Sequence, residues 1–137
     1  MGKRAFIFPG QGSQYVGMAK DLYENSAEAK EMIKVAEDAA GVALSHLMFN
    51  GPEEALKQTD ITQPAIFIHS VVLASIMRTL EPDMVAGHSL GEYSALVTAK
   101  AIQYYDAVTL VRLRGSSMLQ AGIEKPGTMA AIVGLSA

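Results

Sequence analysis

The sequence predicts an α/β protein. Two short apolar runs, Ala5–Phe8 and Met84–Gly87, are each followed by a glycine-containing turn and then by a helical pattern. That order is typical of strands in a parallel α/β sheet, and the first run suits a buried strand better than an edge strand. Apolar residues recur at helical spacing over much of the remaining chain. The 137 residues are enough for one ordinary domain with a core.

The elements between the two strands are expected to be helices. Ser26 is the expected N-cap of a helix that runs to about Ala40, and Gly41 is expected to end it. Two short helices are expected over 44–49 and 52–58, the second with a proline near its start. Thr62 is then expected to cap a longer helix that runs to about residue 80. Because that helix is apolar nearly all round, it should be the central one.

The second strand should lead into a helix that ends near Thr98. Asp106 is the expected N-cap of a last helix to about Ala121, with apolar residues on one face. After a Lys-Pro-Gly break, residues 129–133 are expected to form a third strand. A self-sufficient sheet usually has about four to six strands. We therefore expect this chain to be a piece of a larger fold.

Composition and charge exclude several classes of protein. The net charge is −3 and the basic residues are scattered, which argues against a nucleic-acid partner. Without cysteine there is no disulfide, no thiolate zinc site and no cysteine nucleophile. The longest apolar segment, 65–77, is too short to span a membrane. The mean hydropathy of +0.20 is high for a small chain and suggests burial against more chain or a partner. We expect a cytoplasmic protein with no membrane attachment.

A Gly-x-Ser-x-Gly motif at 87–91 follows the second strand directly. A sharp strand-to-helix turn there would expose the Ser89 hydroxyl, and the N–H of Leu90 would be the first oxyanion donor. The alternative is that Ser89 only caps the helix that begins after it. None of the three histidines is expected to be its general base. His88 adjoins Ser89 and projects elsewhere, while His69 and His46 have ordinary structural explanations.

Two further features bear on chemistry. The Gly-rich stretch 9–14 follows the first strand, where backbone N–H groups can approach a ligand oxygen, although a simple tight turn explains it equally well. Arg114 lies on the apolar stripe of the last helix and should point inward, while Arg112 should face out. An inward guanidinium needs an anion, either a ligand carboxylate or an internal Asp or Glu.

Together these motifs resemble the malonyl-CoA:acyl-carrier-protein transacylases. The matching segments are FPGQGSQ at 8–14, TQPA at 62–65, GHSLGE at 87–92 and RG at 114–115, in the family's order and spacing. The resemblance implies the N-terminal part of an α/β-hydrolase-like large domain over 1–126. Residues 127–137 would then be the start of an inserted ferredoxin-like small domain, with 129–133 as its first strand.

The resemblance also implies roles for individual residues. Ser89 would be the nucleophile, the N–H groups of Gln11 and Leu90 would form the oxyanion hole, Arg114 would bind the malonyl carboxylate and Gln63 would line the acyl pocket. The family's catalytic histidine and a further glutamine lie in a later segment and have no counterpart within these residues.

The expected activity is transfer of malonyl from malonyl-CoA to acyl carrier protein in fatty-acid synthesis, without a metal or a permanently bound cofactor. Malonyl-CoA is the substrate and acyl carrier protein the partner. Three alternatives stay open: a catalytically incomplete module that associates through its sheet edge, an acyltransferase domain of a polyketide synthase, and a serine hydrolase.

Overall fold

The computed structural model describes residues 2–128 and 133–134. The described residues form two strands, with helical segments between them and after the second, and one long helix, α5, lies at the centre. In chain order they are β1 (Ala5–Phe8), α1 (Lys20–Asn25), α2 (Ala27–Ala40), α3 (Leu44–Asn50), α4 (Glu53–Leu56), α5 (Thr59–Ile76), the 3-10 helix Arg78–Leu80, β2 (Met84–Gly87), α6 (Gly91–Thr98) and α7 (Tyr104–Glu124). The predicted α/β class is confirmed.

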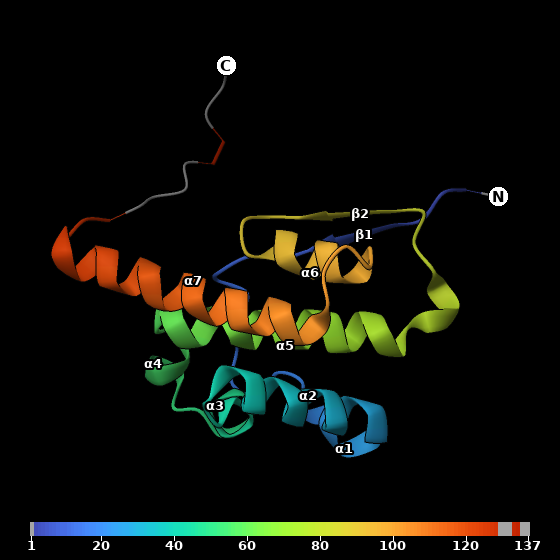
Figure 1. Cartoon of the computed structure of the whole chain (residues 1–137), viewed down its shortest axis with the longest axis horizontal. Helices are drawn as coiled ribbons and strands as arrows, with labels where there is room; N and C mark the ends of the chain where they lie inside the picture. The colour runs from blue at the N-terminus through green and yellow to red at the C-terminus, as the bar shows by residue number, and fades with distance from the viewer. Residues whose placement is uncertain (1, 129–132, 135–137) are drawn as a thin grey trace.

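The two strands pair in parallel, with Ala5 opposite Met84 and Phe8 opposite Gly87. Helix α6 packs against both strands, and α7 lies across α5 (Figure 1). The prediction that β1 is a buried strand is only partly correct. Phe8 is buried, but 78% of Ile7 is exposed, because the described helices cover one face of this two-stranded sheet. The third strand predicted at 129–133 lies largely outside the described residues.

Helix α5 is the centre of the core, as its all-round apolar sequence predicts. The sheet, α6 and α7 lie on one side of α5, and α1, α2 and α3 lie on the other (Figure 1). Ten of its residues are buried: Ile61, Thr62, Gln63, Pro64, Ala65, Ile66, Phe67, Ile68, Val71 and Val72. By length and composition alone α5 could cross a membrane, but packing in the core accounts for its apolar character, since 61% of it is buried.

Several predicted helix ends are confirmed and two are wrong. Ser26 caps α2 by accepting a hydrogen bond from the Ala29 N–H, and Gly41 ends the helix in a left-handed conformation (φ 66°). Helix α5 begins at Thr59 rather than after Thr62, whose hydroxyl is buried and donates to the Leu56 carbonyl. Helix α7 begins at Tyr104 with Gln103 as its N-cap. Asp106 therefore lies in the first turn, where an acidic residue is favourable without acting as the cap.

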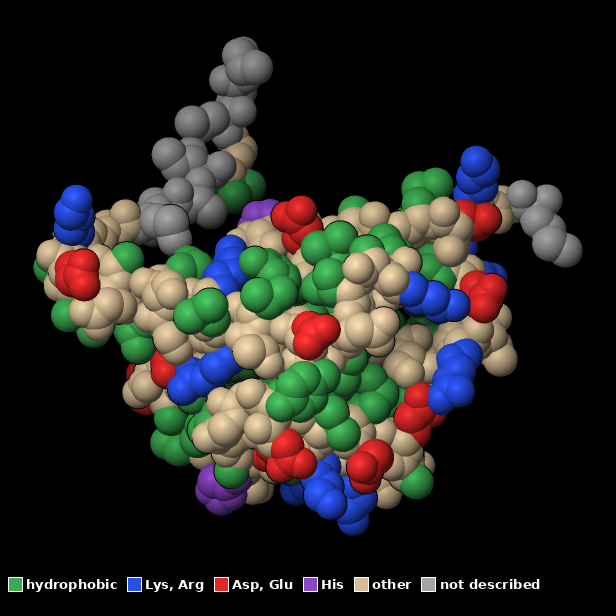
Figure 2. Space-filling view, viewed as in Figure 1, with side chains coloured by type: hydrophobic (Ala, Val, Ile, Leu, Met, Phe, Trp, Pro, Cys, Tyr) green, Lys and Arg blue, Asp and Glu red, His purple; other side chains and the backbone are tan. Residues whose placement is uncertain are grey.

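The outer face of α7 remains apolar. Leu110, Leu113 and Ile123 are 45%, 63% and 65% exposed, and Figure 2 shows hydrophobic side chains spread over this face of the molecule, interspersed with charged ones. This exposure fits the high mean hydropathy of the sequence.

Candidate active site

Ser89 occupies a sharp turn between β2 and α6. Its φ is 52°, a left-handed conformation that costs a non-glycine residue free energy. The turn is packed tightly because glycines stand at its two ends. A Cβ at Gly87 would lie 2.0 Å from the Gly91 carbonyl carbon, and one at Gly91 would lie 2.3 Å from the Phe8 carbonyl oxygen. The two glycines thus allow β1, β2 and α6 to meet and leave Ser89 exposed at the carboxyl end of the sheet.

The Ser89 hydroxyl is in contact with α5 and α7 through one arginine. Arg114 donates from Nη2 to Ser89 Oγ at 3.0 Å and from Nη1 to Gln63 Oε1 at 2.6 Å. Gln63 in turn lies 3.1 Å from the Met118 sulfur, and the Arg114 guanidinium lies 6.0 Å from the centre of the Tyr93 ring. The structure therefore brings three of the predicted site residues, Ser89, Arg114 and Gln63, into one hydrogen-bonded group. The prediction that Arg114 points inward is confirmed.

The interpretation of Ser89 as a mere helix cap is wrong. Helix α6 begins at Gly91 with Leu90 as its N-cap, and no side chain makes a capping hydrogen bond. Ser89 Oγ is engaged by Arg114 instead. A serine in a strained turn, without a capping role and beside a cation, is the arrangement expected of a nucleophile.

The two predicted oxyanion donors, the N–H groups of Gln11 and Leu90, belong to loops that pack against each other. A Cβ at Gly10 would lie 2.8 Å from the His88 carbonyl oxygen, so the loop that carries Gln11 rests against the turn that carries Leu90. Within the described residues, no hydrogen bond engages the N–H of either Gln11 or Leu90. The Gln11 side chain donates to Thr59 Oγ1 at 3.4 Å, which connects its loop to the start of α5.

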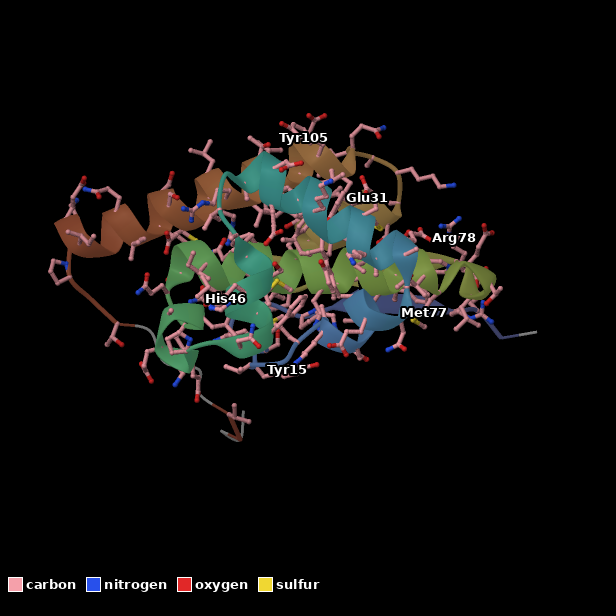
Figure 3. The ribbon with its side chains drawn as sticks, turned by 90° about the horizontal axis from the view of Figure 1, so that it is seen from below. Tyr15, Glu31, His46, Met77, Arg78 and Tyr105 are labelled. Carbon is pink, nitrogen blue, oxygen red and sulfur yellow. The ribbon has the colours of Figure 1, made fainter. Side chains whose placement is uncertain are left out.

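The three histidines do not hydrogen-bond Ser89 in the described structure. His88 is directed at Gly10, with Nδ1 2.8 Å from the position of a Cβ there, which agrees with the prediction that it projects away from Ser89. His46 lies exposed on α3 (Figure 3). This geometry is consistent with the prediction that none of the three histidines is the general base for Ser89.

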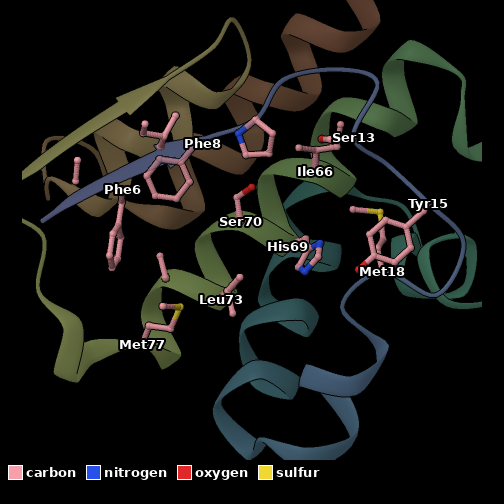
Figure 4. A pocket seen from close by; sticks show the side chains of 14 residues that line it. Phe6, Phe8, Ser13, Tyr15, Met18, Ile66, His69, Ser70, Leu73 and Met77 are labelled. Atoms are coloured by element: carbon pink, nitrogen blue, oxygen red, sulfur yellow. The ribbon is translucent and has the colours of Figure 1, made fainter.

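His69 lies instead in an apolar trough of about 350 Å³ between β1, the 13–18 segment and α5 (Figure 4). Its ring meets the Tyr15 ring edge-on at 6.1 Å between centroids. Burial lowers the pKa of His69 below its ordinary 6.5, and the nearby Asp21 carboxylate opposes that change only in part.

We expect this histidine to make the stability of the chain depend on pH. Because its pKa is lower in the folded state, the unfolded chain binds the proton first as the pH falls below 6.5. The free energy of unfolding should therefore be highest above that pH and fall as the pH approaches the lowered folded pKa. Urea unfolding at about pH 7.5 and 5.5 measures the difference. His69→Gln should reduce the difference, and the control His46→Gln should leave it unchanged. An equal difference in wild type and His69→Gln would contradict the assignment.

The prediction that Arg112 faces out is wrong. Arg112 Nη1 donates to the Asp60 backbone carbonyl at 2.6 Å and to Asp60 Oδ2 at 2.9 Å. Both side chains are largely buried, with 28% and 18% exposed. Helical spacing places Arg112 and Arg114 on different sides of α7, but both side chains are long enough to reach α5, where Arg112 contacts Asp60 and Arg114 contacts Gln63. Sequence reasoning missed Asp60, although it stands one turn before Gln63 on α5.

Among the described residues, no group of three or more His, Asp or Glu side chains is placed to hold a metal ion. The groups that gather at Ser89 are a guanidinium, an amide and backbone N–H groups, all suited to bind an anion or a developing oxyanion. The arrangement can accept an acyl group that carries a carboxylate at its other end.

Comparison with known proteins agrees with this chemistry. Residues 5–136 match the family described as the acyl transferase domain. A "Malonyl CoA-acyl carrier protein transacylase" from Staphylococcus aureus (strain MRSA252) is 47% identical over 135 residues, which cover 98% of this chain and 44% of the relative. The chain thus spans less than half the length of that relative.

Solved structures give the same result. An acyl carrier protein S-malonyltransferase from Vibrio cholerae superposes with a TM-score of 0.82 at 47% identity, over 88% of this chain and 40% of that one. A malonyl-transacylase solved in complex with a type II PKS acyl-carrier protein gives 0.82 at 42% identity, over the same shares. The α/β acyltransferase fold is therefore shown for the described part of the chain.

Proposed function

The chain belongs to the acyl transferase domain family, and we propose that it supplies the nucleophile and the carboxylate-binding group of an enzyme that transfers malonyl from malonyl-CoA to acyl carrier protein in fatty-acid synthesis. The observation that carries the proposal is the 3.0 Å contact between Arg114 Nη2 and Ser89 Oγ. A malonyl carboxylate bound to Arg114 would hold the thioester carbonyl of the same acyl group beside Ser89.

The proposed reaction has two steps. Ser89 Oγ attacks the thioester carbonyl carbon and loses its proton to a general base, while the N–H groups of Gln11 and Leu90 hold the oxyanion. The carbon–sulfur bond breaks, and CoA leaves as the protonated thiol. The phosphopantetheine thiol of acyl carrier protein then attacks the malonyl-Ser89 ester, and Ser89 regains its proton. The general base is proposed to lie outside residues 1–137, which is supported by the position of the three histidines.

Further parts of the proposal rest on the family. Residues 127–137 are proposed to begin an inserted ferredoxin-like small domain, with the boundary of the large domain at 126. The enzyme is proposed to act in the cytoplasm with no membrane attachment and no permanently bound cofactor. The full-length curated relative from Staphylococcus aureus, which is 47% identical where it matches, offers a way to test the activity.

The test uses a chimaera in which residues 1–137 replace the matching segment of the Staphylococcus aureus relative. Intact-mass measurement after mixing with malonyl-CoA should show one added malonyl group, and acyl carrier protein should remove it. The chain alone should acquire malonyl far more slowly, because it lacks the proposed base. A chimaera that folds but acquires no malonyl would overturn the function. Release of free malonate in the absence of acyl carrier protein, as fast as transfer in its presence, would indicate a hydrolase.

Arg114→Ala is expected to lower the preference of the chimaera for malonyl-CoA over acetyl-CoA by on the order of a hundredfold. The physical reason is that the malonyl carboxylate would then be desolvated without a cationic partner. The ratio of the two kcat/KM values measures the effect. The control Arg78→Ala removes an arginine at the far end of α5, where it pairs with Glu28 (Figure 3). Unchanged selectivity in Arg114→Ala would remove the proposed role of Arg114.

A further inference from the structure

The Arg112–Asp60 ion pair lies beside the site without touching Ser89. A single nitrogen, Arg112 Nη1, donates to both the backbone carbonyl and Oδ2 of Asp60. The second carboxylate oxygen, Oδ1, is buried and has no hydrogen-bond partner among the described residues. Arg112 is therefore the cation that balances the largely buried charge of Asp60 in the described structure.

The pair lies where the backbones of α5 and α7 approach each other closely. A Cβ at Gly115 would lie 3.0 Å from the Asp60 Cα and 3.1 Å from the Thr59 carbonyl oxygen. Gly115 follows Arg114 directly, and Asp60 stands three residues before Gln63, so it faces the same side of α5. Two arginines of α7 thus meet two neighbouring side chains of α5: Arg112 binds Asp60, and Arg114 binds Gln63.

This juxtaposition creates a competition for Arg114. An unneutralised carboxylate at position 60 would attract the Arg114 guanidinium more strongly than the neutral amide of Gln63 or the hydroxyl of Ser89 does. We propose that Arg112 is a positioning residue, which neutralises Asp60 and so keeps Arg114 directed at Ser89 and free to bind the carboxylate of the acyl substrate. The role in substrate choice rests on the proposed function, whereas the effect on Arg114 does not.

Three variants of the chimaera test the competition through the ratio of kcat/KM for malonyl-CoA to that for acetyl-CoA. Arg112→Met should lower this ratio about tenfold, the size expected when one charge-assisted hydrogen bond to substrate is weakened. Arg112→Lys should retain the ratio, since one ammonium can replace the single nitrogen that makes both contacts. Arg112→Met combined with Asp60→Asn should restore it, because the competing charge is then gone. The control Arg78→Met removes the Arg78–Glu28 ion pair at the other end of α5 and should change nothing.

Two results with the Arg112→Met variants would overturn the proposal. One is a ratio in Arg112→Met within roughly twofold of wild type. The other is a double variant as impaired as Arg112→Met, since a purely structural role predicts that removing both partners does not help. If Arg112→Met does not fold, Asp60→Asn tests the proposal by itself. This variant should keep the wild-type ratio of the two kcat/KM values, because the competing charge is gone, and a lower ratio would overturn the proposal.

A second readout separates this proposal from the function. In the 137-residue chain, the Arg114 side-chain N–H resonance in ¹⁵N NMR should move in Arg112→Met and return in the double variant. No movement would overturn the proposed competition. Movement together with a wild-type chimaera that acquires no malonyl would support the positioning role of Arg112 and reject the proposed function alone.

Discussion

Ser89→Ala is expected to abolish formation of the malonyl adduct and to lower malonyl transfer by the chimaera by on the order of a million-fold. The loss should be this large because the hydroxyl oxygen forms the acyl ester, and the groups around it bind the substrate and the oxyanion but cannot replace the nucleophile. Intact mass after incubation with malonyl-CoA gives the adduct, and transfer to acyl carrier protein gives the rate. An adduct that persists in Ser89→Ala would place the nucleophile elsewhere.

Ser89→Gly separates the chemistry of this position from its backbone strain. Ser89→Ala and Ser89→Gly should both be inactive. Ser89→Gly should have a higher free energy of unfolding than Ser89→Ala, by about 1 kcal/mol, because glycine adopts a φ of 52° without steric cost. The matched control is Ser116, exposed within α7. There, Ser116→Gly should be less stable than Ser116→Ala by about 1 kcal/mol. Urea unfolding of the four chains measures both differences, and the same sign at the two positions would show that Ser89 is not strained.

Much of the fold could be predicted from local patterns. The strands at 5–8 and 84–87 and helix α2 from its Ser26 cap to Gly41 are confirmed, because each rests on residues close in sequence. The start of α5 could not be predicted from a capping rule. The Thr62 hydroxyl is buried and donates to the Leu56 carbonyl, so tertiary packing determines its role. The exposure of Ile7 could not be predicted either, because the burial of a strand residue depends on what lies over the sheet, and a local apolar run does not specify that.

The candidate site was predictable to the extent that it follows from single motifs. Strand–turn–helix order predicts the position of Ser89 on a sharp turn, and helical spacing predicts the inward direction of Arg114; both placements are confirmed, while the role of Ser89 as nucleophile stays a prediction. The contact of Arg114 with Gln63 pairs residues 51 positions apart, and only the family resemblance indicated Gln63. The Arg112–Asp60 pair was missed for a physical reason. Spacing gives the direction of a Cβ, whereas an arginine side chain is long enough to reach around the helix to a partner.

Gly91→Ala is expected to lower the free energy of unfolding by more than about 3 kcal/mol. The added Cβ would lie 2.3 Å from the Phe8 carbonyl oxygen and 2.8 Å from the Pro9 carbonyl oxygen. Both neighbours are backbone atoms at the end of β1, so no side-chain rotation can relieve the overlap. β1 and α6 would have to separate, and Ser89, which lies in the turn just before α6, would lose its position relative to Arg114.

Gly122→Ala is the matched control, because it makes the same chemical change within α7 where a Cβ would meet nothing within 4 Å. At that position alanine should raise the free energy of unfolding by up to about 1 kcal/mol, through its better helix propensity. Urea unfolding of the chain gives both values. A Gly91→Ala chain within about 0.5 kcal/mol of wild type would contradict the close packing of β1 against α6. Opposite signs at the two glycines would show that close backbone approach, rather than a general intolerance of alanine, requires glycine at the turn that presents Ser89.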